Sequence, residues 1–304
     1  MEHRGGCCAD QDSGDGAGIM TAIPWNLLQA WAQAQGLGEI EAARTGVAMV
    51  FLPQTELARK TARAQFEEAV QATGLKFIGW REVPVAPETL GPLAREFQPW
   101  VAQAVVTTQP VEGDTVEGDA LERSLFLARR RFEKAIDQLS VNPASAPAAA
   151  AALQETYVCS FSGRTIVYKG MVRAEVLGQF YQDLQNPAYE SAFAVYHRRF
   201  STNTLPKWPL AHPMRLLGHN GEINTLVGNI NWMKAREANL SHPSWGEDLA
   251  LLKPGVNADN SDSAILDNAM EVLVRTGRSP AHALTMLVPE AYQNQPELAD
   301  YPEI

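Results

Sequence analysis

Hydrophobic positions along the chain form two patterns, of which short apolar runs are the first. Runs of this kind, bounded by Gly, Pro or polar residues, are typical of β-strands. They predict strands at 46–53, 75–84, 100–110, 156–163, 164–170, 190–201 and 214–220. The two runs on either side of Ser162-Gly163 follow each other so closely that they predict a hairpin-like pair.

Apolar residues at helical spacing are the second pattern. They predict helices at 21–36, 54–74, 119–140, 221–240, 261–277 and 279–292. Gly74 fits the end of its helix, and Ser279 with Pro280 fits a capped start. The expected apolar face of the helix at 54–74 consists of Leu57, Phe66, Ala69 and Val70. In the helix at 119–140 we expect Arg129–Arg131 on a solvated face.

The order of these elements predicts a fold class. Strands come in adjacent groups and helices in others, which favours an α+β layered fold over strict βαβ alternation. The stretch at 141–154 is rich in Pro, Ala and Ser and has no periodicity. We therefore expect one domain over 1–304 that carries a flexible surface insertion at about 141–154.

Composition excludes several classes of protein. The net charge of −10 is unlike a nucleic-acid-binding surface. No apolar run approaches the length of a membrane span, and no signal peptide is recognised. Because of the charge and the short apolar runs, we expect no partnership with nucleic acid or membrane. Three cysteines cannot form a disulfide framework, so we expect the protein to reside in a reducing cytoplasm.

Metal-binding and phosphate-binding motifs are not matched. The six histidines lack metal-ligand spacing, and Cys7-Cys8 is an adjacent pair rather than CxxC. The run of acids and glycines at 10–18 fits neither an EF-hand nor a P-loop. We expect no metal and interpret this run as a tight, glycine-permitted turn.

Three other stretches carry candidate chemistry, and each has a structural alternative. The predicted strand at 214–220 runs into the predicted helix at 221–240, which places Asn220 and Gly221 at a helix N-terminus. Asn220 then serves as an N-cap, or its side-chain amide joins the Gly221 N–H as the two donors of an oxyanion hole. Asp262 at a helix start suits the helix dipole or accepts a ligand ammonium.

The stretch "YHRRFSTNT" places two arginines at the end of a strand, where surface arginines are common. One of them could instead form a bidentate pair with a carboxylate. An Arg for a carboxylate, an Asp for an ammonium and a two-donor oxyanion site together describe a pocket for an α-amino acid whose side-chain amide reacts.

Long motifs then identify a family. These are "EHRGG", "DSGDGAGIMTAIP", "CSFSGRTIVYKGM", "HRRFSTNTLPKWPLAHPMRLLGHNGEINTLVGNINWMKARE", "SDSAILDN" and "GRSPAHALTMLVPEAY". They resemble the N-terminal glutaminase region of the glutamate synthase large subunit, over 1–304 apart from the Ala/Pro-rich stretch. The resemblance implies an N-terminal-nucleophile (Ntn) hydrolase αββα sandwich, in which two antiparallel sheets lie between helices. It also implies hydrolysis of L-glutamine, whose ammonia is used to make L-glutamate from 2-oxoglutarate.

The resemblance also implies roles for single residues. Arg199 of "RRFST" corresponds to the residue that holds the α-carboxylate of glutamine, and Asp262 of "SDS" to the partner of its α-ammonium. Asn220 and Gly221 of "HNG" correspond to the oxyanion hole. Arg4 of "HRG" corresponds to an arginine beside the nucleophile. Thr202 is a further candidate for lining the pocket.

The nucleophile itself is expected to be absent from these 304 residues. Family members begin with a processed cysteine whose α-amino group is the base, and the resemblance places it before "EHRGG". Cys7 and Cys8 are internal and have no free α-amine. We therefore expect a chain truncated at both ends and inactive alone. The alternative is a nucleophile-less module that binds glutamine or another subunit.

Cofactors and further partners follow from the resemblance as well. No cofactor is expected in this chain, whereas FMN and an iron–sulfur cluster are expected in the parent enzyme. The expected partners are L-glutamine, the remaining glutamate synthase chain with its flavin barrel, and ferredoxin or a small electron-donor subunit.

Overall fold

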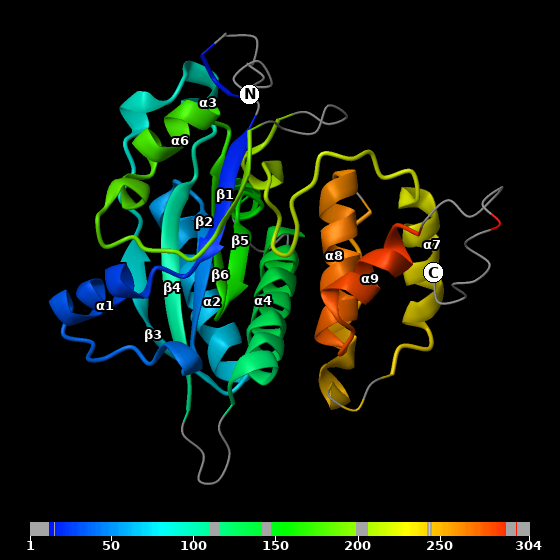
Figure 1. Cartoon of the computed structure of the whole chain (residues 1–304). Coiled ribbons are helices and arrows are strands. Elements are labelled where there is room, and N and C mark those ends of the chain that lie inside the picture. The colour runs from blue at the N-terminus through cyan, green and yellow to red at the C-terminus, as the bar shows by residue number, and fades with distance from the viewer. Residues whose placement is uncertain are drawn as a thin grey trace. The chain divides into compact units, whose positions relative to one another are not determined.

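A computed structural model describes residues 12–14, 16–109, 116–141, 147–198, 206–241, 243, 245–258, 260–289 and 296. The chain divides into two compact units, Met1–Gly218 and His219–Ile304 (Figure 1). The strands all lie in the first unit: β1 (Ala17–Ala22), β2 (Thr45–Leu52), β3 (Leu75–Glu82), β4 (Trp100–Thr108), β5 (Tyr157–Ser162), β6 (Thr165–Gly170) and β7 (Ala194–His197), counted over the described residues.

Helices complete both units. The α-helices of the first unit are α1 (Trp25–Ala34), α2 (Glu56–Ala72), α3 (Pro92–Glu96), α4 (Gly118–Val141), α5 (Pro147–Leu153) and α6 (Ala174–Phe180). Its short 3-10 helices are η2 (Ala42–Arg44), η3 (Pro87–Thr89), η4 (Gln182–Gln185) and η5 (Trp208–Leu210). The second unit contains α7 (Leu226–Glu237), η6 (Gly246–Leu252), α8 (Asp262–Arg275) and α9 (Pro280–Leu287).

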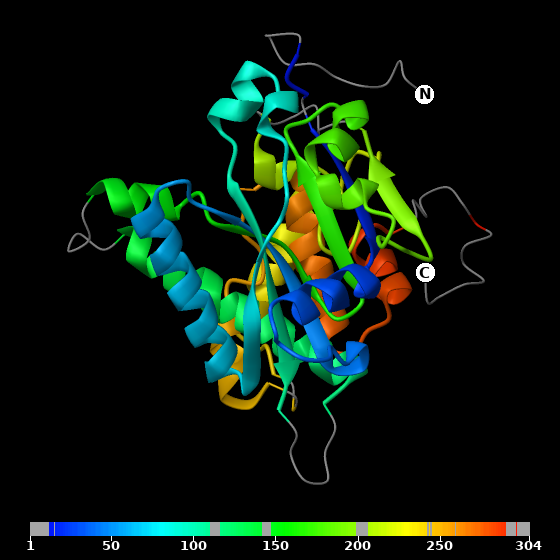
Figure 2. The same ribbon diagram turned by 90° about the vertical axis from the view of Figure 1, so that its left-hand side faces the viewer.

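Two antiparallel sheets form the centre of the first unit. One has the strand order β3-β4-β2-β5 and the other β6-β1-β7. Figure 1 and Figure 2 show α2 and α4 on one side of the four-stranded sheet and the three-stranded sheet on the other. This arrangement confirms the α+β class with two antiparallel sheets.

β2 shows why the layers form. Every residue of its sequence TGVAMVFL is buried, because both faces of this strand pack against other elements. Val47, Met49 and Phe51 belong to the core that also contains Ile166 and Tyr168 of the other sheet. The alternate residues Ala48, Val50 and Leu52 pack with the apolar faces of α2 and α4. The continuous apolar run is thus the signature of a strand between two layers.

The predicted hairpin is wrong, although both of its strands exist. β5 pairs with β2, whereas β6 pairs with β1 in the other sheet. The buried carboxylate of Glu122 fixes the crossover: its Oε1 accepts hydrogen bonds from Ser162 Oγ at 2.8 Å and from Gly163 N at 2.7 Å. Glu122 lies 40 residues away on α4, so the local turn signal could not show this crossover.

β1 differs from the expectation of a helix that starts at residue 21. Residues Ala17–Ala22 form the central strand of the three-stranded sheet, and α1 begins only after Pro24. A Cβ on Gly18 would lie 2.4 Å from the His212 carbonyl oxygen and 2.6 Å from Lys169 Cβ. Gly18, one of the glycines that were expected to form a turn, therefore allows the segment around His212 to approach this strand closely.

Part of the Ala/Pro-rich stretch is also ordered differently from the expectation. Residues Pro147–Leu153 form α5, whose Ala150 and Leu153 are buried. Leu153 packs in the same core as α2 and α4. Residues 142–146 lie outside the described part, and the role of the stretch as an insertion stays a prediction.

Two details of the predicted helix faces are wrong. Leu57 is 68% exposed, whereas Phe66, Ala69 and Val70 are buried as predicted. Arg129 is buried rather than solvated, and its Nη1 donates to Glu133 Oε1 at 2.5 Å. The ion pair with Glu133 makes the burial of this charge possible.

In the second unit, α8 is the most buried helix of those described, and α7 and α9 pack against it. Ser279 caps α9 as predicted, because its Oγ accepts a hydrogen bond from His282 N at 3.2 Å. No helix in the described parts of the chain is long and apolar enough to cross a membrane.

Candidate functional site

The segment that contains Asn220 and Gly221 does not have the predicted form. Residues 214–220 form no strand, and α7 begins at Leu226, five residues after Gly221. Asn220 is therefore not the N-cap of a helix, and the expected helix dipole does not act at Gly221. Both residues are exposed, and His219 Nδ1 lies 3.0 Å from the Gly221 carbonyl oxygen.

A contact far along the chain fixes the start of α7. Its N-cap is Thr225, whose Oγ1 donates to the Leu287 carbonyl oxygen at 2.7 Å. Asn229 Nδ2 donates to the same carbonyl at 2.8 Å. These bonds join the first turn of α7 to the end of α9. Local sequence favoured a cap at Asn220, but the tertiary contact at Leu287 places the helix later.

Asp262 lies where the sequence predicts, as the first residue of α8. Ser261 is the N-cap, and its Oγ accepts a hydrogen bond from Ala264 N at 3.3 Å. Asp262 Oδ1 accepts from Ser263 N at 2.7 Å and from Ser263 Oγ at 3.2 Å. The Asp262 side chain is half-exposed and lies at the positive end of the helix dipole, where an acidic residue is favourable.

The other predicted site residues, Arg4, Arg199 and Thr202, lie outside the described residues, as do Cys7 and Cys8. Strand β7 leads toward Arg199 and pairs with β1. Arg198, the first arginine of the pair, is described, and its Nη2 lies 3.9 Å from Glu175 Oε2 of α6.

Cys159 is the cysteine that the structure describes, and it is fully buried in the core between the sheets. Burial raises the pKa of its thiol to about 12, despite the nearby positive charges of Lys169 and Arg215. Because the thiolate is the reactive form, Cys159 is inert at neutral pH.

A buried polar network, which the sequence did not indicate, joins the two sheets. Arg81 on β3 forms two hydrogen bonds with Asp183 on η4, at 2.7 and 2.6 Å. Tyr168 on β6 donates to Asp183 Oδ2 at 2.9 Å, and Gln103 on β4 bonds to both Tyr168 and Arg81. Burial and the Asp183 carboxylate raise the pKa of Tyr168 well above its ordinary value. The network is closed, so it is structural support rather than a substrate site.

No group of three or more His, Cys, Asp or Glu residues that could hold a metal ion occurs among the described residues. The predicted site residues that the structure describes are Asn220, Gly221 and Asp262, and all three belong to the second unit.

Comparison with known proteins gives a consistent result. The family described as "Glutamine amidotransferases class-II" matches residues 1–303. Ferredoxin-dependent glutamate synthase 2 of Synechocystis sp. is 57% identical over 305 residues, and the chloroplastic ferredoxin-dependent glutamate synthase of Oryza sativa subsp. japonica is 50% identical. The Arabidopsis thaliana ferredoxin-dependent glutamate synthase 1 is 48% identical.

The extent of these matches is uneven. Each alignment covers all of this chain but 18% of the relative, so the chain spans less than a fifth of the length of these curated relatives. The family match, in contrast, includes nearly every residue and all of the described elements. The protein therefore belongs to the class-II glutamine amidotransferases, a family of N-terminal-nucleophile hydrolases.

Proposed function

We propose that the chain is the glutaminase part of a ferredoxin-dependent glutamate synthase, which supplies ammonia from L-glutamine for the synthesis of L-glutamate. The observation that carries this proposal is the family match over residues 1–303. The names of the relatives at 48–57% identity support it, although the chain spans 18% of their length.

Substrate recognition in this proposal depends on charge. Asp262 accepts hydrogen bonds from the α-ammonium of glutamine, and Arg199 holds the α-carboxylate by a bidentate pair. Thr202 and Arg4 line the same pocket. The placement of the Asp262 carboxylate at the N-terminus of α8 supports its part, because the backbone around it fixes its orientation.

Catalysis requires donors for the oxyanion that develops on the side-chain amide. We assign them to Asn220 Nδ2 and the Gly221 N–H. Since no helix dipole acts at Gly221, these two groups stabilise the oxyanion through their own hydrogen bonds. The loss of one such donor typically costs about 2.7–4 kcal/mol of transition-state stabilisation.

The proposed partners lie in other parts of a glutamate synthase. FMN and the iron–sulfur cluster are bound there. The flavin barrel receives the ammonia, and ferredoxin is the electron donor that the relatives' names indicate. We also propose a reducing, cytoplasm-like compartment, in which Cys159 stays a thiol.

The proposal is tested by glutamine binding to the Asp262→Asn variant. Calorimetric titration compares L-glutamine with glutaramate, the same molecule without its α-amino group. We expect glutaramate to bind the unmodified protein about tenfold more weakly, because a hydrogen bond between charged groups contributes about 1.5–3 kcal/mol. In the Asp262→Asn variant we expect the two ligands to bind with equal affinity.

Glu222→Gln is the matched control, since it removes an exposed carboxylate from the same unit. It should leave the preference for glutamine unchanged. If Asp262→Asn weakens the binding of L-glutamine and of glutaramate by the same factor, Asp262 does not contact the ammonium group. If the unmodified protein binds neither ligand, the proposed glutamine site is wrong.

A further inference from the structure

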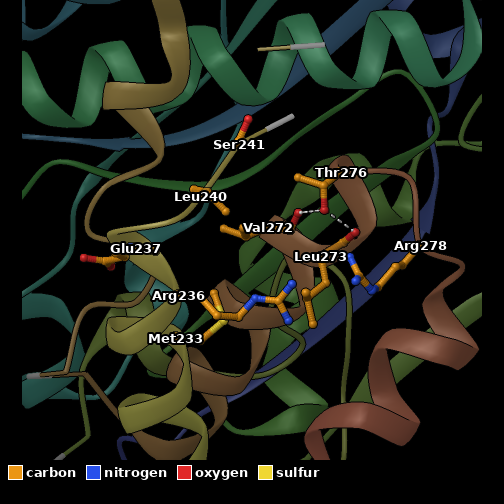
Figure 3. Close-up of a pocket in the computed structure, with 10 residues that line it drawn as sticks. Met233, Arg236, Glu237, Leu240, Ser241, Val272, Leu273, Thr276 and Arg278 are labelled. Atoms are coloured by element: carbon orange, nitrogen blue, oxygen red, sulfur yellow. Dashed lines mark hydrogen bonds between the residues drawn. The ribbon is translucent and has the colours of Figure 1, made fainter. Parts of the chain in front are cut away.

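A cavity in the second unit, away from Asp262, is lined by two arginines and an apolar wall. Its volume is about 220 Å³, smaller than the cavities of about 300–1,000 Å³ that hold drug-sized ligands. It lies between the ends of α7 and α8 (Figure 3). The residues that line it are Met233, Arg236, Glu237, Leu240, Ser241, Gly255, Val272, Leu273, Thr276 and Arg278.

The two arginines are not used by ion pairs within the described part of the chain. Arg236 is exposed and Arg278 is half-buried, and neither forms a salt bridge with a described residue. Arg278 Nε is buried and has no hydrogen-bond partner there. Figure 3 shows both guanidinium groups pointing toward the Leu273 side chain from opposite sides. The cavity therefore presents a positive charge.

The end of α8 does not require these charges. Basic residues often stabilise the carbonyl groups at a helix C-terminus, which would be a structural role for Arg278. Here Arg278 N donates to the Leu273 carbonyl at 3.2 Å, and Gly277 N donates to that of Val274 at 3.0 Å. Thr276 Oγ1 donates to the Val272 and Leu273 carbonyls at 2.9 Å. The last turn is thus closed without the Arg278 guanidinium.

Among the described residues that line the cavity, the one acid is also engaged elsewhere. Glu237 Oε1 accepts a hydrogen bond from Gly255 N at 2.7 Å. In Figure 3 its carboxylate points away from the arginines and from Val272. Glu237 therefore fixes the neighbouring loop and does not neutralise Arg236 and Arg278.

We propose that this cavity binds a small organic acid, whose carboxylate is held by Arg236 and Arg278 and whose hydrocarbon body packs on the apolar wall. A guanidinium group binds a carboxylate through two parallel hydrogen bonds. Met233, Leu240, Val272 and Leu273 provide the apolar contact. The carboxylate of the bound acid gives Arg278 Nε a hydrogen-bond acceptor, which this nitrogen lacks among the described residues.

The test is a titration of the whole 304-residue chain with 4-methylpentanoate, followed by NMR of ¹³C-methyl methionine. The Met233 methyl signal reports the cavity, and the Met233→Leu variant assigns it. We expect a saturable shift of this signal with the acid. The neutral isostere 4-methylpentanamide should bind about tenfold more weakly, because it lacks the charge that pairs with the arginines.

Variants separate the two arginines from general charge. Arg236→Gln and Arg278→Gln should each weaken binding of the acid about tenfold. Lys234→Gln removes a positive charge from an exposed position of the same helix, outside the cavity, and should leave binding unchanged. Circular dichroism of Arg278→Gln shows whether its fold is kept. Arg236→Gln tests the binding of the acid at an exposed position, where the substitution does not disturb the core.

Three results would overturn the proposal. The Met233 signal could stay unchanged at millimolar acid, or acid and amide could shift it with equal affinity. Inorganic phosphate could bind as tightly as 4-methylpentanoate, which would show that the apolar wall contributes nothing.

Discussion

At the scale of single residues, Arg81 and Asp183 form a buried ion pair in the first unit. Asp183 is 1% exposed and receives hydrogen bonds from Arg81 and Tyr168. The desolvation of such a pair is offset only while both partners are present. Nothing local in the sequence indicates the pair, because 102 residues separate Arg81 from Asp183.

Asp183→Asn should therefore lower the free energy of unfolding by about 3–5 kcal/mol, since it leaves Arg81 buried without its counter-charge. Urea denaturation at neutral pH measures this change. Asp119→Asn is the control, because the Asp119–Arg164 pair is exposed and should contribute at most about 1 kcal/mol. Equal effects of the two variants would contradict the importance of burial.

Glu133 gives a prediction about pH. Burial alone would raise its pKa, but Arg129, Arg130 and Arg215 outweigh burial and lower it to about 2. A carboxyl group whose pKa is lower in the folded state than in the unfolded state stabilises the protein at pH values above its unfolded-state pKa. This contribution is lost as the pH falls toward 2. Glu133→Gln should thus cost roughly 1–3 kcal/mol at pH 7 and much less near pH 2.

Urea denaturation of both proteins at several pH values between about 2 and 7 measures this difference. Glu39→Gln, at an exposed position, is the control and should change the free energy of unfolding by at most about 0.5 kcal/mol. A destabilisation by Glu133→Gln that stays constant over this range would show that the arginines do not act on its charge.

At the scale of elements, the sequence predicted those whose signals are local. The apolar run of β2, the amphipathic pattern of α4 and the capped start of α9 all lead to observed elements. The errors arise where a distant contact decides. Gly18 admits a crossing segment into β1, and Leu287 holds the first turn of α7.

Gly18→Ala should be strongly destabilising, by at least about 3 kcal/mol, because the added Cβ would meet backbone and Cβ atoms rather than flexible side-chain ends. Gly178→Ala is the matched control. Gly178 lies within α6, no atom lies within 4 Å of its added Cβ, and the change should stabilise by about 0.5–1 kcal/mol. Thermal unfolding distinguishes destabilisation by Gly18→Ala from stabilisation by Gly178→Ala. A Gly18→Ala variant of unchanged stability would contradict the close approach of His212 and Lys169 to Gly18.

At the scale of the whole molecule, the sequence predicted the family and the class of fold better than the site. Asp262 lies where local capping signals place it. Asn220 and Gly221 do not, because their position depends on how α7 meets α9. A resemblance transfers residue identities between proteins, but it does not transfer the local structure inferred from propensity.

The polypeptide of these 304 residues should release no ammonia from L-glutamine above a buffer blank. Cys159 is a buried thiol, and Cys7 and Cys8 are internal and have no free α-amine. An assay coupled to glutamate dehydrogenase measures the ammonia. A chain extended by a segment that begins with cysteine is the positive control, and turnover by the 304-residue polypeptide would refute the prediction.

The register of β1 has a consequence for synthesis on the ribosome. Ala22 pairs with Thr165, and Ala17 pairs with Gly170. About 140 residues must be translated after β1 before its partner exists, which takes roughly 7–28 s at about 5–20 residues per second. β7, its other neighbour, is made later still. Of the described strands, β1 at the centre of the three-stranded sheet is thus made first and waits longest for its neighbours, so the nascent chain offers chaperones an unpaired strand during that interval.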